Sequence, residues 1–304
     1  MAEDSGTEGR LHAELAASAV PDSVRRAFGG TPPDPAAGQI WRACWDDVVE
    51  LVVVLGVDGL DLAVAPVSLD RTYADDTTVV LSAEVTSLGV ALAVWAGLER
   101  RVQMRVLDRF AGLVNLDFAD DGWARYAVES GLAEFGSRPG NATDPLWEYR
   151  AIIEDEMDQL VAAAWSQGTG ELAGLLVSSG LTVTALAETL SVPLPSALGI
   201  WRGVSVVTQV QAGRLSAGLG VPASDIMSAN PALPTSLLVR MSHPRRRAQV
   251  RRLSAHRRVS EAQAWAVAGY ETYALAARQT GETAEPAWDE RIDTYFHTVL
   301  SDST

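Results

Sequence analysis

Residues 180–192 of the 304-residue chain read GLTVTALAETLSV, and residues 193–203 continue as PLPSALGIWRG. Thr182 is suited to cap a helix that begins at Val183, and the leucines and alanines that follow recur at helical spacing. A second short helix is expected from the prolines of the second string, because proline is tolerated in the first turn of a helix. The pattern predicts two short helices joined by a tight turn.

Helical patterns surround this pair and continue to the end of the chain. Gly, Pro and Ser punctuate the apolar periodicity at short intervals. We expect helices at 171–178, 183–190, 195–201, 208–219 and 223–227, followed by longer helices at 244–256, 261–279 and 286–300. The sequence therefore predicts an all-α bundle over residues 171–230 and trailing helices over 231–304.

The N-terminal part has a different pattern. Short runs rich in Val and Leu are separated by Gly, Asp or Ser, which is typical of strands and turns. The runs lie at 48–55, 62–67, 78–81, 91–95 and 104–107. So many strands within about eighty residues favour a small, strongly bent barrel. We expect an N-terminal helix and linker at 1–37 and a β-barrel at 38–140.

An acidic helix is predicted between these two parts, within residues 141–170. Thr143 or Asp144 precedes Pro145, and apolar residues then recur at helical spacing. Four carboxylates within residues 154–158 suggest a metal site, but helical geometry spreads them around the axis. We interpret this segment as a solvated linker helix. The predicted fold class is α+β, with a small barrel, an acidic linker helix and a C-terminal all-α domain.

The charge of −15 is unevenly distributed. Residues 1–170 carry −16, residues 171–260 carry +7 and residues 261–304 carry −6, and every basic residue is Arg. A net-acidic protein is steered away from nucleic acid as a whole, although its basic region can still be attracted. The charge therefore restricts any nucleic-acid contact to the region around residues 171–260.

The sequence contains no signal for several classes of function. The single cysteine, Cys44, excludes an internal disulfide framework, and the four histidines are scattered, which disfavours a zinc site. We expect no metal, no cofactor and no catalytic residue, because phosphate loops, metalloprotease motifs and nucleophile elbows are missing. The apolar runs are too short for a membrane span, and the acidic N-terminus is unlike a signal peptide. A cytoplasmic protein without a membrane partner is expected.

Three anchors in the bundle carry a resemblance to a known family. They are Gly180-Leu181-Thr182, Arg202-Gly203 and Leu219-Gly220-Val221. With these anchors, about a fifth of the chain, residues 172–227, resembles the Xre or lambda-repressor-like DNA-binding family in spacing and helix length. The resemblance implies a helix-turn-helix domain that binds DNA, and it implies a homodimer because such proteins usually read DNA as dimers.

The start of the implied recognition helix departs from the family. Base readout needs side chains such as Arg, Asn or Gln, whereas residues 193–199 are PLPSALG. Val183 stands where the family usually has Gln, so only Thr184 and Ser196 can donate hydrogen bonds from these positions. A helix-turn-helix that has been repurposed for protein contact remains an open alternative.

Residues 243–258, HPRRRAQVRRLSAHRR, supply the positive charge that the bundle lacks. Arg forms two bonds with phosphate, and about four such contacts would give a log–log salt slope of roughly −3.6. Alternatively, the segment lies against the acidic helix of its own chain or of a second subunit. The candidate DNA-binding residues are Thr184, Ser196, Arg202, Arg245, Arg246, Arg247, Arg251, Arg252, Arg257 and Arg258.

The N-terminal strands carry a second resemblance. The strings are GQIW (38–41), ELVVVL (50–55), VAPVS (64–68) and VQMRVLDR (102–109). Their order resembles the SH3-like barrel of the MazF/PemK toxins, which implies cleavage of single-stranded RNA. Ser68 matches a family position, but Glu50 and Leu51 replace the Arg-Pro pair. Without that positive charge at the reacting phosphate, we expect a ligand-binding, peptide-binding or dimerisation module instead of a ribonuclease.

Three functions follow from these patterns. The first is a DNA-binding transcriptional regulator of the Xre type, with a barrel that binds a partner or ligand. The second is a protein-interaction component of a toxin–antitoxin or phage-defence assembly with a degenerate helix-turn-helix. The third is a divergent RNA-cleaving toxin that depends on Ser68.

Overall fold

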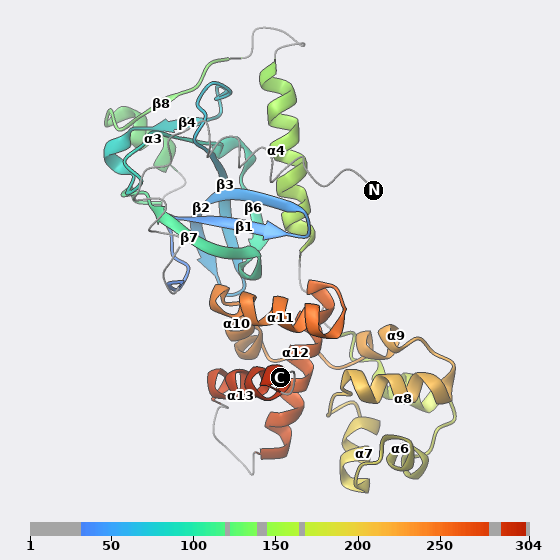
Figure 1. The fold of residues 1–304 in the computed structure, drawn as a ribbon. Helices are drawn as coiled ribbons and strands as arrows, with labels where there is room; N and C mark the ends of the chain where they lie inside the picture. Colours follow the sequence, from blue (N-terminus) through green and yellow to red (C-terminus); the bar gives the residue numbers. More distant parts are fainter. Residues whose placement is uncertain (1–31, 119–121, 139–144, 164–167, 280–286, 302–304) are drawn as a thin grey trace. The chain divides into compact units, whose positions relative to one another are not determined.

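The computed structural model describes residues 32–118, 122–138, 145–163, 168–279 and 287–301. The chain is α+β, as the sequence predicts, and it divides into two compact units (Figure 1). The sheet unit comprises Met1–Ala164 together with Ser242–Arg247. The helical unit comprises Trp165–Met241 together with Ala248–Thr304. Part of the arginine-rich segment therefore belongs to the sheet unit.

The sheet unit is built on one antiparallel sheet. Its strands are β1 (Gln39–Trp45), β2 (Val48–Asp58), β3 (Asp61–Ser68), β4 (Val79–Leu81), β5 (Leu92–Val94), β6 (Arg100–Gln103), β7 (Leu107–Leu113) and β8 (Ala133–Phe135). They pair in the order β7-β1-β2-β3-β5-β4-β8, and β6 pairs with β3 beside this path. The path has two ends, β7 and β8, so the sheet formed by the described strands is not closed.

Both faces of the β1–β2 hairpin are buried. The hairpin turns through two residues, and Asp46 there has φ of 46°, which suits the right-handed twist of the strands. Cys44 and Leu51 point into the main core, whereas Trp41 and Glu50 alternate with them toward the other face. Cys44 is thus a buried, unbridged residue, as expected.

The second face is covered by the acidic helix α4 (Pro145–Ala162), which contacts β1, β2 and β6 (Figure 1). The buried residues of α4 include Ile153, Met157 and Leu160. Arg100 of β6 holds two of its carboxylates, with Nη2 3.0 Å from Glu154 Oε1 and Nε 2.8 Å from Asp158 Oδ1. The helix predicted as a solvated linker therefore packs on the sheet along its length. Within the residues that the structure describes, the other α-helix of this unit is α3 (Trp123–Glu129).

One predicted strand is wrong. Residues 104–107 form mainly a 3₁₀ turn, Met104–Val106, between β6 and β7. The chain turns here because β6 pairs with β3 while β7 pairs with β1. Four of the eight strands, β1, β6, β7 and β8, lie outside the predicted runs, apart from Leu107 at the start of β7.

The helical unit follows the predicted order closely. Its first helices are α5 (Leu172–Ser178), α6 (Val183–Leu190), α7 (Leu194–Trp201), α8 (Gln209–Leu219) and α9 (Ala223–Ser228). They are followed by α10 (Thr235–Ser242), α11 (Arg247–Arg257), α12 (Glu261–Gln279) and α13 (Trp288–Ser301). The helix α10 was not predicted. A short 3₁₀ helix, Pro244–Arg246, precedes α11 where one continuous helix was expected.

Candidate functional site

The turn between α6 and α7 is fixed by local sequence. The Thr182 side chain caps α6 by accepting a hydrogen bond from the Ala185 amide at 3.2 Å. Ser191 ends the helix in the left-handed conformation, with φ of 54° and ψ of 47°. Pro193 then starts α7, because its fixed φ suits a helix start. Two eight-residue helices are thereby joined by three residues, which matches the expected pair of helices and its tight turn.

The segment between α7 and α8 is held in place by the buried side-chain amide of Asn230. The Asn230 side chain accepts from the Val207 amide at 2.8 Å and donates to the Val207 carbonyl at 3.0 Å. Thr208 and Gln211 then form a reciprocal capping box at the start of α8. Because Asn230 is fully buried, this clamp fixes where the loop emerges beside α7.

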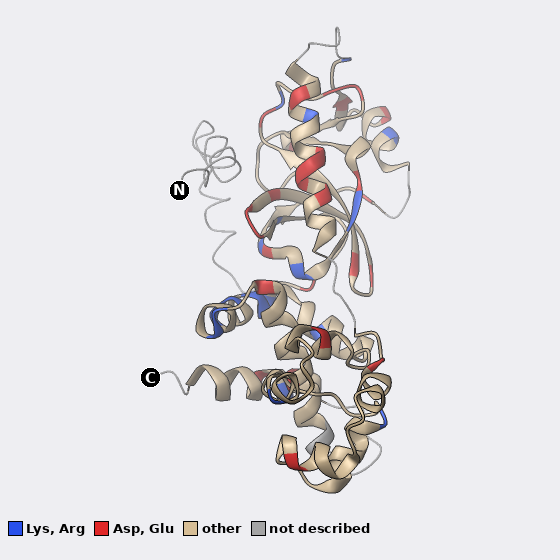
Figure 2. Cartoon of the chain, turned by 90° about the vertical axis from the view of Figure 1, so that its right-hand side faces the viewer, with Lys and Arg blue, Asp and Glu red and all other residues tan. Residues whose placement is uncertain are grey.

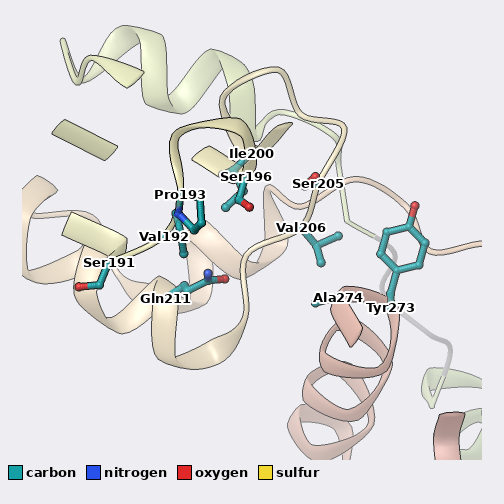
Figure 3. A pocket seen from close by; sticks show the side chains of 10 residues that line it. All are labelled: Ser191, Val192, Pro193, Ser196, Ile200, Ser205, Val206, Gln211, Tyr273 and Ala274. Atoms are coloured by element: carbon teal, nitrogen blue, oxygen red, sulfur yellow. The ribbon is translucent and has the colours of Figure 1, made fainter. Parts of the chain in front are cut away.

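A pocket of about 330 Å³ opens beside the start of α7 (Figure 3). It lies between the α6–α7 turn, the loop after α7, the start of α8 and helix α12. Its ten lining residues carry no carboxylate, guanidinium or imidazole group. They are Ser191, Val192, Pro193, Ser196, Ile200, Ser205, Val206, Gln211, Tyr273 and Ala274.

Three exposed apolar side chains are adjacent in sequence to residues that line this pocket. Leu194 is 55% exposed, Val204 is 70% exposed and Val210 is 60% exposed. Each is a chain neighbour of a lining residue, namely Pro193, Ser205 and Gln211. We name the pocket and these three side chains the α7 face. Three exposed apolar side chains that are next in sequence to residues lining one pocket make this part of the helical unit a candidate binding surface.

The α7 face has little charge near it. Across residues 183–228 the chain has two carboxylates, Glu188 and Asp225, and two arginines, Arg202 and Arg214. Arg214 donates to the Leu190 carbonyl at 2.9 Å and so closes the C-terminal end of α6. In Figure 2 most of the helices α6–α9 are tan. The remaining cation, Arg202, is exposed at the end of α7.

The three candidate DNA-binding residues of the bundle are all exposed. Thr184 lies in the first turn of α6, Ser196 in the first turn of α7 and Arg202 at the C-cap of α7. Ser196 also lines the pocket. The bundle therefore presents two hydroxyl groups and one cation from the residues that the sequence singled out.

Arg246 and Arg247 are buried in the sheet unit. Arg247 is 2% exposed, and its Nη1 donates to the Val106 carbonyl. Its guanidinium lies 5.9 Å from the centre of the Trp45 ring, and that of Arg105 lies 4.5 Å from the same ring. The buried Glu50 lies on the strand that pairs with Trp45. These arginines pack inside the sheet unit, where a buried charge needs nearby polar partners.

His243 belongs to the same packed segment. Its Nε2 lies 2.8 Å from Asp34 Oδ1, and its Nδ1 accepts from the Arg245 amide at 3.2 Å. Burial of the imidazole lowers the pKa of His243, and the nearby cations of Arg245 and Arg246 act in the same direction. The exposed Asp34 opposes this effect without overcoming it. The neutral imidazole is therefore the form that suits the fold.

Two arginines of α11 are held by carboxylates of α12. Arg251 Nε lies 3.2 Å from Glu261 Oε2, and Arg257 makes two 2.9 Å hydrogen bonds to Glu271. Burial raises the pKa of Tyr295, and the adjacent Glu271 carboxylate raises it further. The other candidates in this segment are exposed, and they are Arg245, Arg252 and Arg258. Most of the segment's polar chemistry is thus directed at its own chain.

Ser68, the candidate residue for RNA cleavage, lies under α4. It is 1% exposed, accepts from the Asp70 amide at 3.0 Å and lies 3.3 Å from the Tyr149 hydroxyl. Tyr149 also stacks on Tyr73 at a centroid distance of 4.4 Å. Asp70 accepts from the Thr72 amide at 2.9 Å, which is the hydrogen bond of a local turn. The site that the toxin resemblance implies is covered by a helix of the same chain.

Sequence reasoning missed the pocket of the α7 face and the Asn230 clamp. The pocket needs Tyr273 and Ala274 from α12, which are far from α7 in sequence. Asn230 precedes a proline, which indicates a turn but not a buried clamp. Glu261 and Glu271 were available as partners for the arginines, since they follow the segment in the next predicted helix.

The comparisons with known proteins give no family. No protein-family model matches the chain, and a search of curated proteins finds no match either. Within the described ranges, no group of three or more His, Cys, Asp or Glu side chains is arranged to hold a metal ion. Of the helices in those ranges, none is by itself long and apolar enough to span a membrane; α5 and α6 meet the criteria only when joined across their 107° bend.

Proposed function

We propose that this chain is a regulatory protein-interaction component. Its helical unit has a helix-turn-helix fold of the Xre type, and its α7 face binds an apolar protein surface. Its sheet unit is a divergent SH3-like module in which α4 occupies the face that carries Ser68. This is the protein-interaction alternative of the sequence analysis, now preferred over DNA binding.

The exposed start of α7 carries the proposal. In helix-turn-helix proteins the first residues of the second helix contact base edges. Here those residues are Leu194, Pro195 and Ser196, and Leu194 is more than half exposed. An exposed leucine between two prolines offers a rigid apolar contact, and little conformational entropy is lost when such a contact is buried.

Electrostatics supports the same choice. DNA affinity depends on neutralising phosphates, and each contact adds about −0.9 to the log–log salt slope. Two of the expected cations, Arg246 and Arg247, are buried in the sheet unit, and Arg251 and Arg257 are paired with carboxylates. A protein surface requires no such positive field.

The test is selection of binding peptides from a displayed library by the purified full-length chain. We expect enriched peptides with Leu, Phe or Trp anchors, because the pocket lining is uncharged and exposed apolar side chains are chain neighbours of its lining residues. Leu194→Asp should weaken their binding at least tenfold. Val57→Asp, an exposed apolar position in β2 of the other unit, is the matched control and should leave binding unchanged. Selected peptides that bind Leu194→Asp as well as they bind the natural chain would refute the proposal.

A DNA-binding regulator is the second candidate, and one observation favours it. The α6–Ser191–α7 geometry presents Thr184, Ser196 and Arg202 as exposed groups, and Arg252 and Arg258 are exposed in and after α11. Under this candidate, DNA fragments bind with an affinity that falls steeply with salt. Binding is then lost when Arg202, Arg252 and Arg258 become Ala, while the peptide selection yields nothing that depends on Leu194.

A further inference from the structure

The interior of the pocket beside α7 differs in chemistry from the exposed apolar side chains near it. Its volume of about 330 Å³ lies within the range of small-molecule sites. Two of its lining residues, Ile200 and Val206, are buried apolar side chains. Three hydroxyl groups and one amide also line it, and they belong to Ser196, Ser205, Tyr273 and Gln211. The pocket therefore combines apolar walls with a few uncharged polar groups, as ligand sites commonly do.

The side-chain amide of Gln211 is held in one orientation by the capping box of α8. Its Oε1 accepts from the Thr208 amide at 2.8 Å, and the Gln211 backbone amide donates to Thr208 Oγ1 at 3.3 Å. Because a backbone N–H only donates, the oxygen end of the side chain must face Thr208. Figure 3 shows Gln211 below Ser196 at the pocket. The amino group, Nε2, is the end that is left for a ligand, and its position is set in advance.

The hydroxyl groups of the pocket add to this donor. Within the ranges that the structure describes, the side chains of Ser196, Ser205 and Tyr273 make no hydrogen bond. A hydroxyl group both donates and accepts, whereas the amino group of Gln211 only donates. A purely apolar ligand would cover these groups without giving them partners, which is unfavourable. The pocket therefore favours a ligand that carries an oxygen acceptor.

The pocket also disfavours a charged ligand. None of its ten lining residues carries a carboxylate, guanidinium or imidazole group. An ammonium or carboxylate group that enters the pocket loses water and gains no ionic partner there. A neutral ligand has no such cost.

We propose that the pocket is a binding site for a small neutral molecule in which an apolar ring or chain carries a carbonyl group, with the carbonyl oxygen accepting from Gln211 Nε2. The apolar part of the molecule packs against Ile200 and Val206. This site goes beyond the proposed function, because the proposed protein partner contacts exposed side chains such as Leu194, whereas the small molecule contacts the pocket interior.

Three probes of nearly the same shape test the proposal, since benzamide is neutral, benzamidine is a cation and benzoate is an anion. Each is titrated to about 10 mM into the isotope-labelled full-length chain at about 150 mM salt, and the NMR signals of the Gln211 side-chain amide are followed. We expect benzamide to bind with a dissociation constant on the order of 1 mM, as suits about nine non-hydrogen atoms. The two charged probes should bind at least tenfold more weakly.

Gln211→Glu should reverse this preference without unfolding the chain. A Glu side chain also accepts from the Thr208 amide, so the capping box is kept, and far-ultraviolet circular dichroism checks the fold. The variant replaces the amide donor with a negative oxygen. Benzamide should therefore bind at least fivefold more weakly, and benzamidine at least fivefold more tightly, with binding followed by the other signals of the pocket. Gln209→Glu adds the same charge to α8 outside the pocket lining and should leave all three affinities within twofold.

Benzamide that does not bind the natural chain would overturn the inference, and so would equal affinities of the three probes or benzamide binding that Gln211→Glu leaves unchanged. Leu194→Asp separates this outcome from that of the proposed function, because it should leave benzamide binding within twofold. If benzamide binding depends on Gln211 but no Leu194-dependent peptide is selected, only the proposed function fails. If Leu194-dependent peptides are selected but benzamide does not bind, only the small-molecule site fails.

Discussion

The arginine-rich segment 243–258 and the start of α7 use their side chains in opposite ways. In the segment, Arg247 is buried and hydrogen-bonded to Val106, and Arg257 is paired with Glu271. At the start of α7, Leu194 is exposed beside a pocket without charge. Arginine side chains that look available in the sequence are buried or paired within the folded chain, whereas an apolar side chain of a type that is usually buried is exposed to solvent. The difference shows that a binding surface is indicated by which side chains are exposed in the structure, and not by how many of a given type the sequence contains.

Replacing the buried Arg247 is expected to give the largest loss of unfolding free energy. Arg247→Ala removes the hydrogen bond to Val106 and the packing of the guanidinium over Trp45. We expect the chain to lose about 3 kcal/mol of unfolding free energy, measured by urea denaturation. Arg252→Ala, on the exposed side of α11, is the control and should change stability by less than about 0.5 kcal/mol. Equal effects of the two variants would erase the distinction between buried and exposed arginines.

The clamp behind the α7 face provides the next largest effect. Asn230→Ala leaves the amide and the carbonyl of Val207 without their buried partners. The expected loss is about 2 kcal/mol, followed as the loss of helical circular dichroism on denaturation. Ser224→Ala, at an exposed position of α9, is the control. An Asn230→Ala chain as stable as the control would mean that the loop after α7 is not held in the way described.

His243 gives a smaller effect that appears with pH. Its pKa is lowered in the fold, so the unfolded chain binds more protons as pH falls through the ordinary histidine value of about 6.5. The stability contributed by neutral His243 is therefore full above that value and is lost as pH falls toward the folded-state pKa. Urea midpoints at about pH 7.5 and about pH 5.5 should differ less in His243→Gln than in the natural chain. An unchanged difference would show that His243 does not contribute.

The smallest effect is expected at the α7 face itself. Leu194→Ser removes an exposed side chain, so stability should change by less than about 0.5 kcal/mol. The measurement is the same urea titration, made at low protein concentration so that association does not contribute. A loss as large as that of Asn230→Ala would mean that Leu194 serves the fold and not a binding surface.

The order and positions of the bundle helices could be predicted because their signals are local. Thr182, Pro193 and Thr208 set helix starts, and Ser191 and Gly220 end helices in the left-handed conformation. The α+β class and four of the strands followed from similar short-range patterns. These features depend on residues that lie within one or two turns of each other.

The candidate site depends on contacts between residues that are distant in the chain, so most of it could not be predicted from the sequence. The burial of Arg247 depends on Val106, in the 3₁₀ turn before β7 and 141 residues away, and on Trp45, about two hundred residues earlier in the chain. The same is true of Ser68, which Tyr149 of α4 covers, and of Tyr273, which completes the pocket beside α7. The periodicity of a helix indicates that one of its faces is apolar, but it does not indicate which element covers that face.

The most direct test of the account is fluorescence anisotropy of mixed genomic DNA fragments with the full-length chain, from about 50 to about 300 mM salt. The Arg202→Ala, Arg252→Ala, Arg258→Ala triple variant is measured alongside. We expect no saturable binding at about 150 mM salt and no difference between the two proteins, since we propose that the α7 face binds protein and not DNA. Saturable binding that weakens steeply with salt and disappears in the triple variant would contradict it and establish the arginines as phosphate contacts.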